Sequence, residues 1–152
     1  MPDVAMRSTF IVGFPGETEE EFEALLAFVE EARFDHLGVF TYSHEEGTWA
    51  HRLADDVPDL AKQDRRDRLM TVQQRIAFEQ NESRLGSTVE VLVEGAHPET
   101  EHLLVGRAST QAPDVDGQIL LNDGYAERGT FARVLLTETA GYDLVGRILG
   151  AA

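Results

Sequence analysis

The residues best placed to do chemistry lie where an apolar run stops at a glycine turn and becomes an acidic helix start. This junction is the stretch Ser8-Thr-Phe-Ile-Val-Gly-Phe-Pro-Gly-Glu-Thr-Glu-Glu-Glu-Phe22. In α/β folds, the loop after the C-terminal end of a parallel strand faces the cofactor or substrate, and a glycine there lets the backbone approach it closely. The junction therefore predicts a ligand site, although many α/β proteins make such a turn for steric reasons alone.

The acidic side chains of this junction decide which ligand charge it favours. A helix N-terminus normally attracts anions. Four glutamates offset that dipole and favour a ligand that carries positive charge or hydroxyl donors: Glu17, Glu19, Glu20 and Glu21. A sulfonium compound with an amino group and a ribose has these groups. The alternative is that the glutamates cap the helix; we favour capping for residues 19–21, and for Glu17 both interpretations stay open.

Two further sets of polar and aromatic residues are candidates for binding. Phe40 and Tyr42 can stack on an adenine, and Thr41 and Ser43 offer hydrogen bonds at the C-terminal end of a strand, although for Phe40 we favour core packing. Near the C-terminus, a second set can contact a substrate protein: Arg107, Asp114 and Asp116. This region also has the composition of a turn, and both interpretations stay open.

The first site requires a strand–helix–strand unit to position it. Residues 10–12 form a continuous apolar run that is typical of a buried parallel strand. Thr18 and Glu21 make a capping box that starts a helix ending near Arg33, and residues 37–40 supply a second strand. The crossover should be right-handed with parallel strands.

A long helix should follow, opened by Pro58 and closed by Gly86. Its inward positions include Leu69, Val72, Ile76 and Leu85. Its polar face mixes acids with bases, so we expect it to be solvated and assign it no chemistry. The basic members of that face are Lys62, Arg65, Arg66 and Arg68.

From Ser87 the hydrophobic period changes to two, with Val89, Val91 and Val93 alternating against polar residues. Four more short strands are expected at residues 102–108, 118–121, 131–136 and 142–148. Five short strands predict a small closed antiparallel barrel, because closure removes exposed edges. We therefore expect two domains, an α/β segment at residues 1–84 and an all-β barrel at 85–152.

Composition excludes several classes of site and partner. The 152 residues include no cysteine, which excludes disulfides, thiolate metal sites and iron–sulfur ligation within this chain. The net charge of −15 repels a polyphosphate backbone and attracts basic protein surfaces, so nucleic acid is an unlikely partner. No apolar run approaches the roughly 20 residues of a membrane span, and the N-terminus lacks the order of a signal peptide. We expect no membrane partner and a cytoplasmic location.

In its motifs the chain resembles the C-terminal part of the radical S-adenosylmethionine methylthiotransferases. Residues 10–22 are similar to the last strands of the family's (β/α) barrel, residues 38–48 to its next strand and loop, and residues 84–150 to its terminal TRAM barrel. Within the family, residues 105–117 (Val-Gly-Arg-Ala-Ser-Thr-Gln-Ala-Pro-Asp-Val-Asp-Gly), with 142–146, resemble the RimO branch. That branch modifies an aspartate on a small-subunit ribosomal protein.

The resemblance implies a fold, a reaction and a partner. The fold is the last portion of a radical-SAM barrel followed by a five-stranded antiparallel TRAM barrel. The reaction is insertion of a methylthio group at an unactivated carbon, with S-adenosylmethionine and [4Fe-4S] clusters as cofactors and a basic small-subunit ribosomal protein as partner. Val12, Gly13, Phe14 and Glu17 would border the S-adenosylmethionine pocket.

The chain departs from the family's pattern in its lack of cysteine. The family holds one cluster through a CxxxCxxC motif on an early loop and a second through cysteines of an N-terminal domain. We therefore expect no metal ligand here, an inactive chain on its own, and the missing N-terminal part as a partner. Two alternatives stay open: a non-catalytic TRAM-type module binding ribosomal protein or RNA, and a fragment of the tRNA-modifying MiaB branch, which lacks the stretch Ala112–Gly117.

Overall fold

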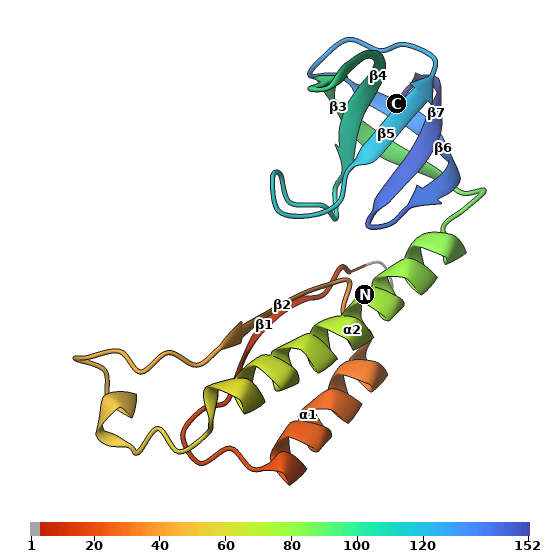
Figure 1. The fold of residues 1–152 in the computed structure, drawn as a ribbon. Helices are drawn as coiled ribbons and strands as arrows, with labels where there is room; N and C mark the ends of the chain where they lie inside the picture. The colour runs from red at the N-terminus through yellow and green to blue at the C-terminus, as the bar shows by residue number, and fades with distance from the viewer. Residues whose placement is uncertain (1–3) are drawn as a thin grey trace. The chain divides into compact units, whose positions relative to one another are not determined.

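The computed structural model describes residues 4–152, which divide into two compact units (Figure 1). The N-terminal unit ends at Ala77, and the C-terminal unit spans Phe78–Ala152. The division falls inside the long helix α2 (Asp59–Ser83), before the boundary expected at residue 84. The end of α2 belongs to the second unit because the Phe78 ring packs on Tyr142, with centroids 5.3 Å apart.

The N-terminal unit contains the expected strand–helix–strand arrangement. Strand β1 (Arg7–Val12) pairs in parallel with β2 (His36–Thr41), and helix α1 (Glu19–Ala32) connects them. A short 3₁₀ helix, η1 (Ala50–Arg52), lies between β2 and α2 in sequence. The two strands and two helices share one core, whose buried members are Val12, Phe22, Val29, Val39, Leu69 and Ile76.

Helix α1 begins and ends where its sequence signals predict. The Thr18 hydroxyl accepts a hydrogen bond from the Glu21 amide (3.2 Å), and the Glu21 carboxylate accepts one from the Thr18 amide (2.8 Å). Arg33 ends the helix in the left-handed region, with φ of 49°. The capping box is therefore confirmed.

Only one face of the β1–β2 sheet is covered by helices. Phe10 and Val12 point toward the shared core, whereas Ile11 is 57% exposed and Phe40 is 62% exposed. The expectations that residues 10–12 form a strand buried on both faces and that Phe40 packs in the core are therefore wrong. Alternation along a strand sends every second side chain to the opposite face, and within residues 4–77 nothing covers that face.

The C-terminal unit is a closed five-stranded barrel with strand order β3-β4-β5-β7-β6 (Figure 1). Its strands are β3 (Thr88–His97), β4 (Thr100–Ala108), β5 (Ile119–Asp123), β6 (Phe131–Ala140) and β7 (Asp143–Ala151). All neighbours are antiparallel except β5 and β7, which pair in parallel. The expectation of a wholly antiparallel barrel is wrong for this pair, because directions can alternate around a ring only if the number of strands is even.

Alternating side chains of the strands fill the barrel. Val91 and Val93 are fully buried and Val89 packs against them, as the period-two pattern predicts. The remaining buried members of this core are Ile119, Leu121, Ala132, Val134, Leu136 and Leu144.

Gly146 of β7 allows the barrel to close tightly, so replacing it should destabilise the unit. A Cβ at this position would lie 2.5 Å from Val134 Cγ1 and 2.9 Å from the Leu135 carbonyl oxygen. Because a backbone atom cannot move aside cheaply, we expect Gly146→Ala to lower the barrel's free energy of unfolding by about 1–3 kcal/mol. Hydrogen exchange of the β6 and β7 amides as a function of denaturant measures this change.

Gly38→Ala is the matched control for this substitution, since Gly38 also lies within a strand and its added Cβ would meet nothing closer than 3.6 Å. This control should leave hydrogen exchange of the β6 and β7 amides unchanged. Equal exchange rates in the two variants would show that the barrel accommodates the methyl group.

Candidate functional site

The turn at residues 13–17, which follows β1, is fixed by hydrogen bonds. The Gly13 amide donates to Glu17 Oε1 (3.0 Å), and the Gly16 amide donates to Asp56 Oδ1 (2.8 Å). The Tyr42 amide donates to the Val12 carbonyl (2.8 Å), which ties the end of β2 to the end of β1. The C-terminal ends of both strands are therefore held next to each other.

Two basic residues of α2 reach this turn and are buried. Lys62 is 3% exposed and Arg65 is 6% exposed, so the expectation of a solvated basic face is wrong for both. Arg65 Nη1 lies 2.7 Å from Glu17 Oε1, and Lys62 Nζ lies 2.7 Å from Asp55 Oδ1. The bond to Asp55 raises the pKa of Lys62 although burial alone would lower it.

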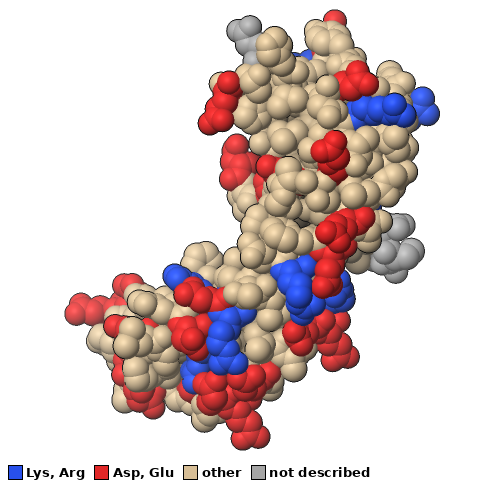
Figure 2. Space-filling view, turned by 45° about the vertical axis from the view of Figure 1, so that its right-hand side comes forward, with Lys and Arg blue, Asp and Glu red and all other residues tan. Residues whose placement is uncertain are grey.

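The remaining bases of that face are more exposed, as expected. Arg66 pairs with its neighbour Asp67 at 2.8 Å, and Arg68 pairs with Glu19 at 3.0 Å. Hydrogen bonds from Arg68 and then from Arg65 lower the pKa of Glu19. Figure 2 shows basic side chains of the N-terminal unit lying among acidic ones, so this surface offers no uniform charge to a partner.

Gly13 is required by the packing of α2 on the turn. Its φ of +75° is a conformation that side chains rarely adopt, and a Cβ there would collide with Cγ of Lys62. The space beside the Gly13 Cα is thus filled by the Lys62 side chain. On that side of the glycine a lysine stem approaches closely, and close approach of a ligand stays a prediction.

Aromatic rings line the adjoining strand ends. Phe14 and Tyr42 meet edge to face with centroids 5.3 Å apart, and the Tyr42 hydroxyl lies 3.2 Å from His44 Nδ1. The rings of His44 and His51 lie 4.3 Å apart. These rings form a partly exposed strip beside the 13–17 turn, of the kind on which a nucleobase can stack.

The structure brings most of the expected cofactor-binding residues to this end of the sheet, in different environments. Phe14 is 41% exposed, and the Ser43 hydroxyl donates to Glu45 at 2.6 Å. Thr41 is half-buried at the end of β2. The side chain of Val12, by contrast, is fully buried between sheet and helices, which leaves its backbone as the part facing the strand ends.

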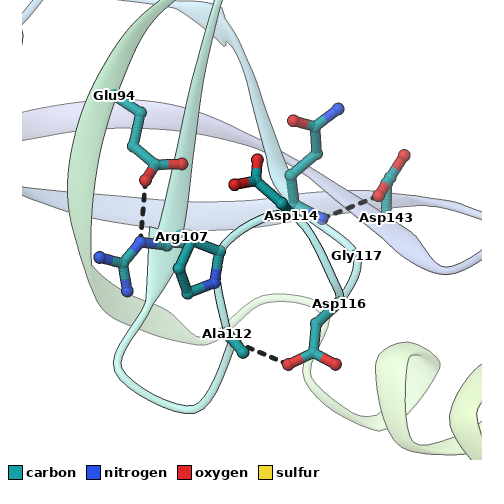
Figure 3. A pocket seen from close by; sticks show the side chains of 9 residues that line it. Glu94, Arg107, Ala112, Asp114, Asp116, Gly117 and Asp143 are labelled. Atoms are coloured by element: carbon teal, nitrogen blue, oxygen red, sulfur yellow. Dashed lines mark hydrogen bonds and ion pairs between the residues drawn. The ribbon is translucent and has the colours of Figure 1, made fainter.

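A second candidate site is a pocket of about 260 Å³ in the barrel unit, here called the barrel pocket (Figure 3). It contains all three residues expected to contact a substrate protein, Arg107, Asp114 and Asp116. Its other lining residues are Glu94, Ala112, Pro113, Gly117, Gln118 and Asp143. Four carboxylates against one guanidinium make the barrel pocket acidic.

The two expected aspartates have different roles in the barrel pocket. Asp116 accepts a hydrogen bond from the Ala112 amide (2.6 Å), which is the turn-forming role. Asp114 has φ of 60° and is exposed, and no hydrogen bond or ion pair links its carboxylate to the residues that the structure describes. Asp114 is therefore the carboxylate most available to a partner, and Figure 3 shows it between Arg107 and Asp143.

Sequence reasoning missed two acids of the barrel pocket, Glu94 and Asp143. Glu94 Oε1 lies 2.8 Å from Arg107 Nε, and Asp143 Oδ1 accepts from the Gln118 amide (2.8 Å). Glu94 follows Val93 on the outward face of β3, so the period-two pattern marks it as exposed. Nothing in the sequence near Asp143 indicates that β7 brings it beside the Gln118 backbone.

No metal site or membrane-spanning helix is found in the described part of the chain. Residues 4–152 contain no group of three or more His, Asp or Glu side chains arranged to hold a metal ion. None of the helices described is both long and apolar enough to cross a membrane.

Comparison with known proteins matches the chain over nearly its whole length. The TRAM domain family matches residues 85–149. The chain is 55% identical over 149 residues to the ribosomal protein uS12 methylthiotransferase RimO of Anaeromyxobacter sp. (strain K), which covers 98% of this chain and 32% of that protein. It is 52% identical to the RimO of Myxococcus xanthus, covering 98% of this chain and 31% of that protein.

A third relative, the RimO of Geobacter sulfurreducens, is 50% identical over 149 residues, which again covers 98% of this chain and 33% of that protein. The chain thus spans about a third of the length of the curated relatives it matches. Over 98% of its length the chain is therefore similar to RimO methylthiotransferases, and its residues 85–149 are similar to the TRAM domain family.

Proposed function

We propose that this chain is the part of a radical-SAM methylthiotransferase that completes the S-adenosylmethionine pocket and docks the substrate protein. The parent reaction is methylthiolation of an aspartate of ribosomal protein uS12. The observation that carries the proposal is identity of 50–55% with RimO proteins across 98% of the chain. Residues 4–77 are then the last portion of a (β/α) barrel, and the exposed face with Ile11 and Phe40 is the face toward its interior.

The residues at the ends of β1 and β2 fit one side of a bound S-adenosylmethionine. The partly exposed rings of Phe14 and Tyr42 offer an apolar surface for the adenine. Ser43 is exposed and offers its hydroxyl for a hydrogen bond. Glu17 is held by Arg65 and by the Gly13 amide, so it shapes the pocket wall through the turn. When bound, S-adenosylmethionine supplies the sulfonium whose cleavage starts the reaction.

Iron–sulfur clusters do not fit the residues of this chain. Biological clusters are held by thiolates, and the 152 residues include no cysteine. The cluster ligands of the parent enzyme therefore come from the remaining two thirds of its length, which is the partner this chain needs for catalysis.

The barrel is proposed to dock the basic ribosomal protein through the barrel pocket. Residues 83–152 carry 10 acids against 5 bases, which disfavours phosphate backbones and favours a lysine- or arginine-rich surface. Within the barrel pocket, the carboxylate of Asp114, which has no partner among the residues that the structure describes, is available to a cationic side chain of the partner. This acidity also favours the uS12-modifying branch over a tRNA-modifying one.

Neutralising the aspartates of the barrel pocket should weaken protein docking. We expect Asp114→Asn with Asp116→Asn to raise the Kd for purified uS12 about tenfold at low salt, with a smaller effect at high salt because salt screens the charges. Asparagine at position 116 still offers an oxygen to the Ala112 amide, so the turn is preserved. Titration calorimetry at two salt concentrations, with tRNA as a second ligand, measures the effect.

The matched control is Asp123→Asn with Glu127→Gln, which removes the same charge from exposed positions outside the barrel pocket. Equal weakening by both double variants would assign the effect to net charge and reject the barrel pocket as the docking site. Tighter binding to tRNA than to uS12 would reject the branch assignment.

A further inference from the structure

Lys62 and Arg65 lie close to the 13–17 turn, and the sequence alone gives them no function. Their exposures of 3% and 6% are unusual, because Lys and Arg are almost never enclosed unless they are paired. Each is paired with an acid of a loop: Lys62 with Asp55, and Arg65 with Glu17. The pairs therefore connect α2 to the loops that follow β1 and β2.

Arg65 makes three hydrogen bonds here, two to the turn and one to the first residue of α1. Its Nη1 donates to Glu17 Oε1 (2.7 Å) and to the Glu17 carbonyl (3.2 Å), and its Nη2 donates to Glu19 Oε2 (3.2 Å). The same Glu17 Oε1 accepts the Gly13 amide at 3.0 Å. One carboxylate oxygen thus links the guanidinium to the backbone at the start of the turn.

Lys62 fixes the other side of the turn. Its aliphatic stem occupies the space where a Gly13 side chain would be, and its ammonium group lies 5.4 Å from the centre of the Tyr42 ring. Lys62 therefore lies beside both Gly13 and Tyr42, which are at the ends of the two strands. The hydrogen bond from the Tyr42 amide to the Val12 carbonyl also holds these strand ends together.

A buried ion pair is weak evidence for a role in stability alone. Replacing a buried ion pair by apolar residues is often neutral or stabilising. Arg65 also leaves its Nε buried with no hydrogen-bond partner among residues 4–152, which is unfavourable for folding. A residue selected only to fill this space would have no need of a charge.

We propose that Arg65 and Lys62 are positioning residues of the S-adenosylmethionine pocket, which hold the 13–17 turn and Tyr42 in place without touching the cofactor. This inference rests on the proposed function, because only that function places a ligand beside the turn. It predicts that the turn loosens, and that cofactor affinity falls, when the charged contacts of Arg65 are removed.

The first measurement follows the turn itself in this chain. Arg65→Met keeps a long side chain but removes the three hydrogen bonds, and hydrogen exchange of the Gly13 and Gly16 amides reports on the turn. We expect Gly13 exchange to accelerate about tenfold or more relative to the core amides of β2. Arg66→Met is the control, since within the described part of the chain Arg66 pairs with its exposed neighbour Asp67 alone; this variant should leave the exchange unchanged.

The second measurement follows the cofactor in a complete enzyme. A chimera carries this chain in place of the matching third of the Anaeromyxobacter relative, and equilibrium dialysis with labelled S-adenosylmethionine gives its Kd. We expect Arg65→Met to raise that Kd about tenfold and Arg66→Met to leave it unchanged. If Arg65→Met does not fold, Arg65→Lys replaces it, because lysine keeps the charge and loses the two-pronged contact.

Each contrary result has a distinct meaning. Unchanged Gly13 exchange in the Arg65 variants would overturn the positioning role, whatever the cofactor does. Faster Gly13 exchange with an unchanged Kd for S-adenosylmethionine would also overturn the positioning role. In that case Arg65 would hold the turn, but the turn would not border the pocket, so the proposed function would be the part that fails.

Discussion

Anaerobic incubation of this chain with iron and sulfide should leave no stoichiometric iron–sulfur absorbance and should yield no 5′-deoxyadenosine from S-adenosylmethionine. Reductive cleavage of the sulfonium needs an electron from a bound cluster, and the chain has no thiolate to hold iron. The expected effect is complete loss of activity relative to a full-length RimO. Absorbance spectra and chromatographic detection of 5′-deoxyadenosine provide the two measurements.

The full-length Anaeromyxobacter relative, treated identically, is the positive control for reconstitution. A cluster that persists on this chain after desalting would mean that carboxylate or imidazole ligands suffice. Formation of 5′-deoxyadenosine would reject the assignment of this chain as the part of the enzyme without cluster ligands.

Replacing Phe22 by alanine should largely unfold the N-terminal unit. Phe22 is fully buried in the core shared by both strands and both helices, and Arg65 and Arg68 lie 5.5 and 4.8 Å from its ring centre. Phe22→Ala removes the ring from this core and should lower the free energy of unfolding by about 3–5 kcal/mol. Hydrogen exchange of the α1 amides measures that loss separately from the barrel.

Phe28→Ala is the matched control on the same helix, because Phe28 is 50% exposed. It should change exchange in α1 much less than Phe22→Ala does. Comparable losses in the two variants would mean that the core can collapse into the space left by Phe22.

Local signals predicted much of the fold. The capping box needs only Thr18 and Glu21, three residues apart, and it set the start of α1 correctly. The alternation of Val91 and Val93 needs only one strand, and both are buried in the barrel core. Such signals are complete within a few residues, so no knowledge of the tertiary structure is required.

The features that sequence reasoning missed depend on distant partners. Arg65 is buried because its acid, Glu17, lies 48 positions away, and a helix face of mixed charges gives no sign of that pairing. Phe40 is exposed because only one face of the sheet is covered, which a run of apolar residues does not reveal. The barrel pocket was half predicted, since its loop residues Asp114 and Asp116 were identified while Asp143 on β7 was not.

The parallel pair of β5 and β7 affects the order in which the barrel can fold. The β6–β7 hairpin closes across only two residues, Gly141 and Tyr142, so its contacts are local and form early. Joining Ile119 to Leu144 in parallel instead requires closing a loop that includes the whole of β6. The parallel pairing of β5 with β7 therefore has the larger entropic cost of loop closure. It should form late and limit the rate at which the barrel closes.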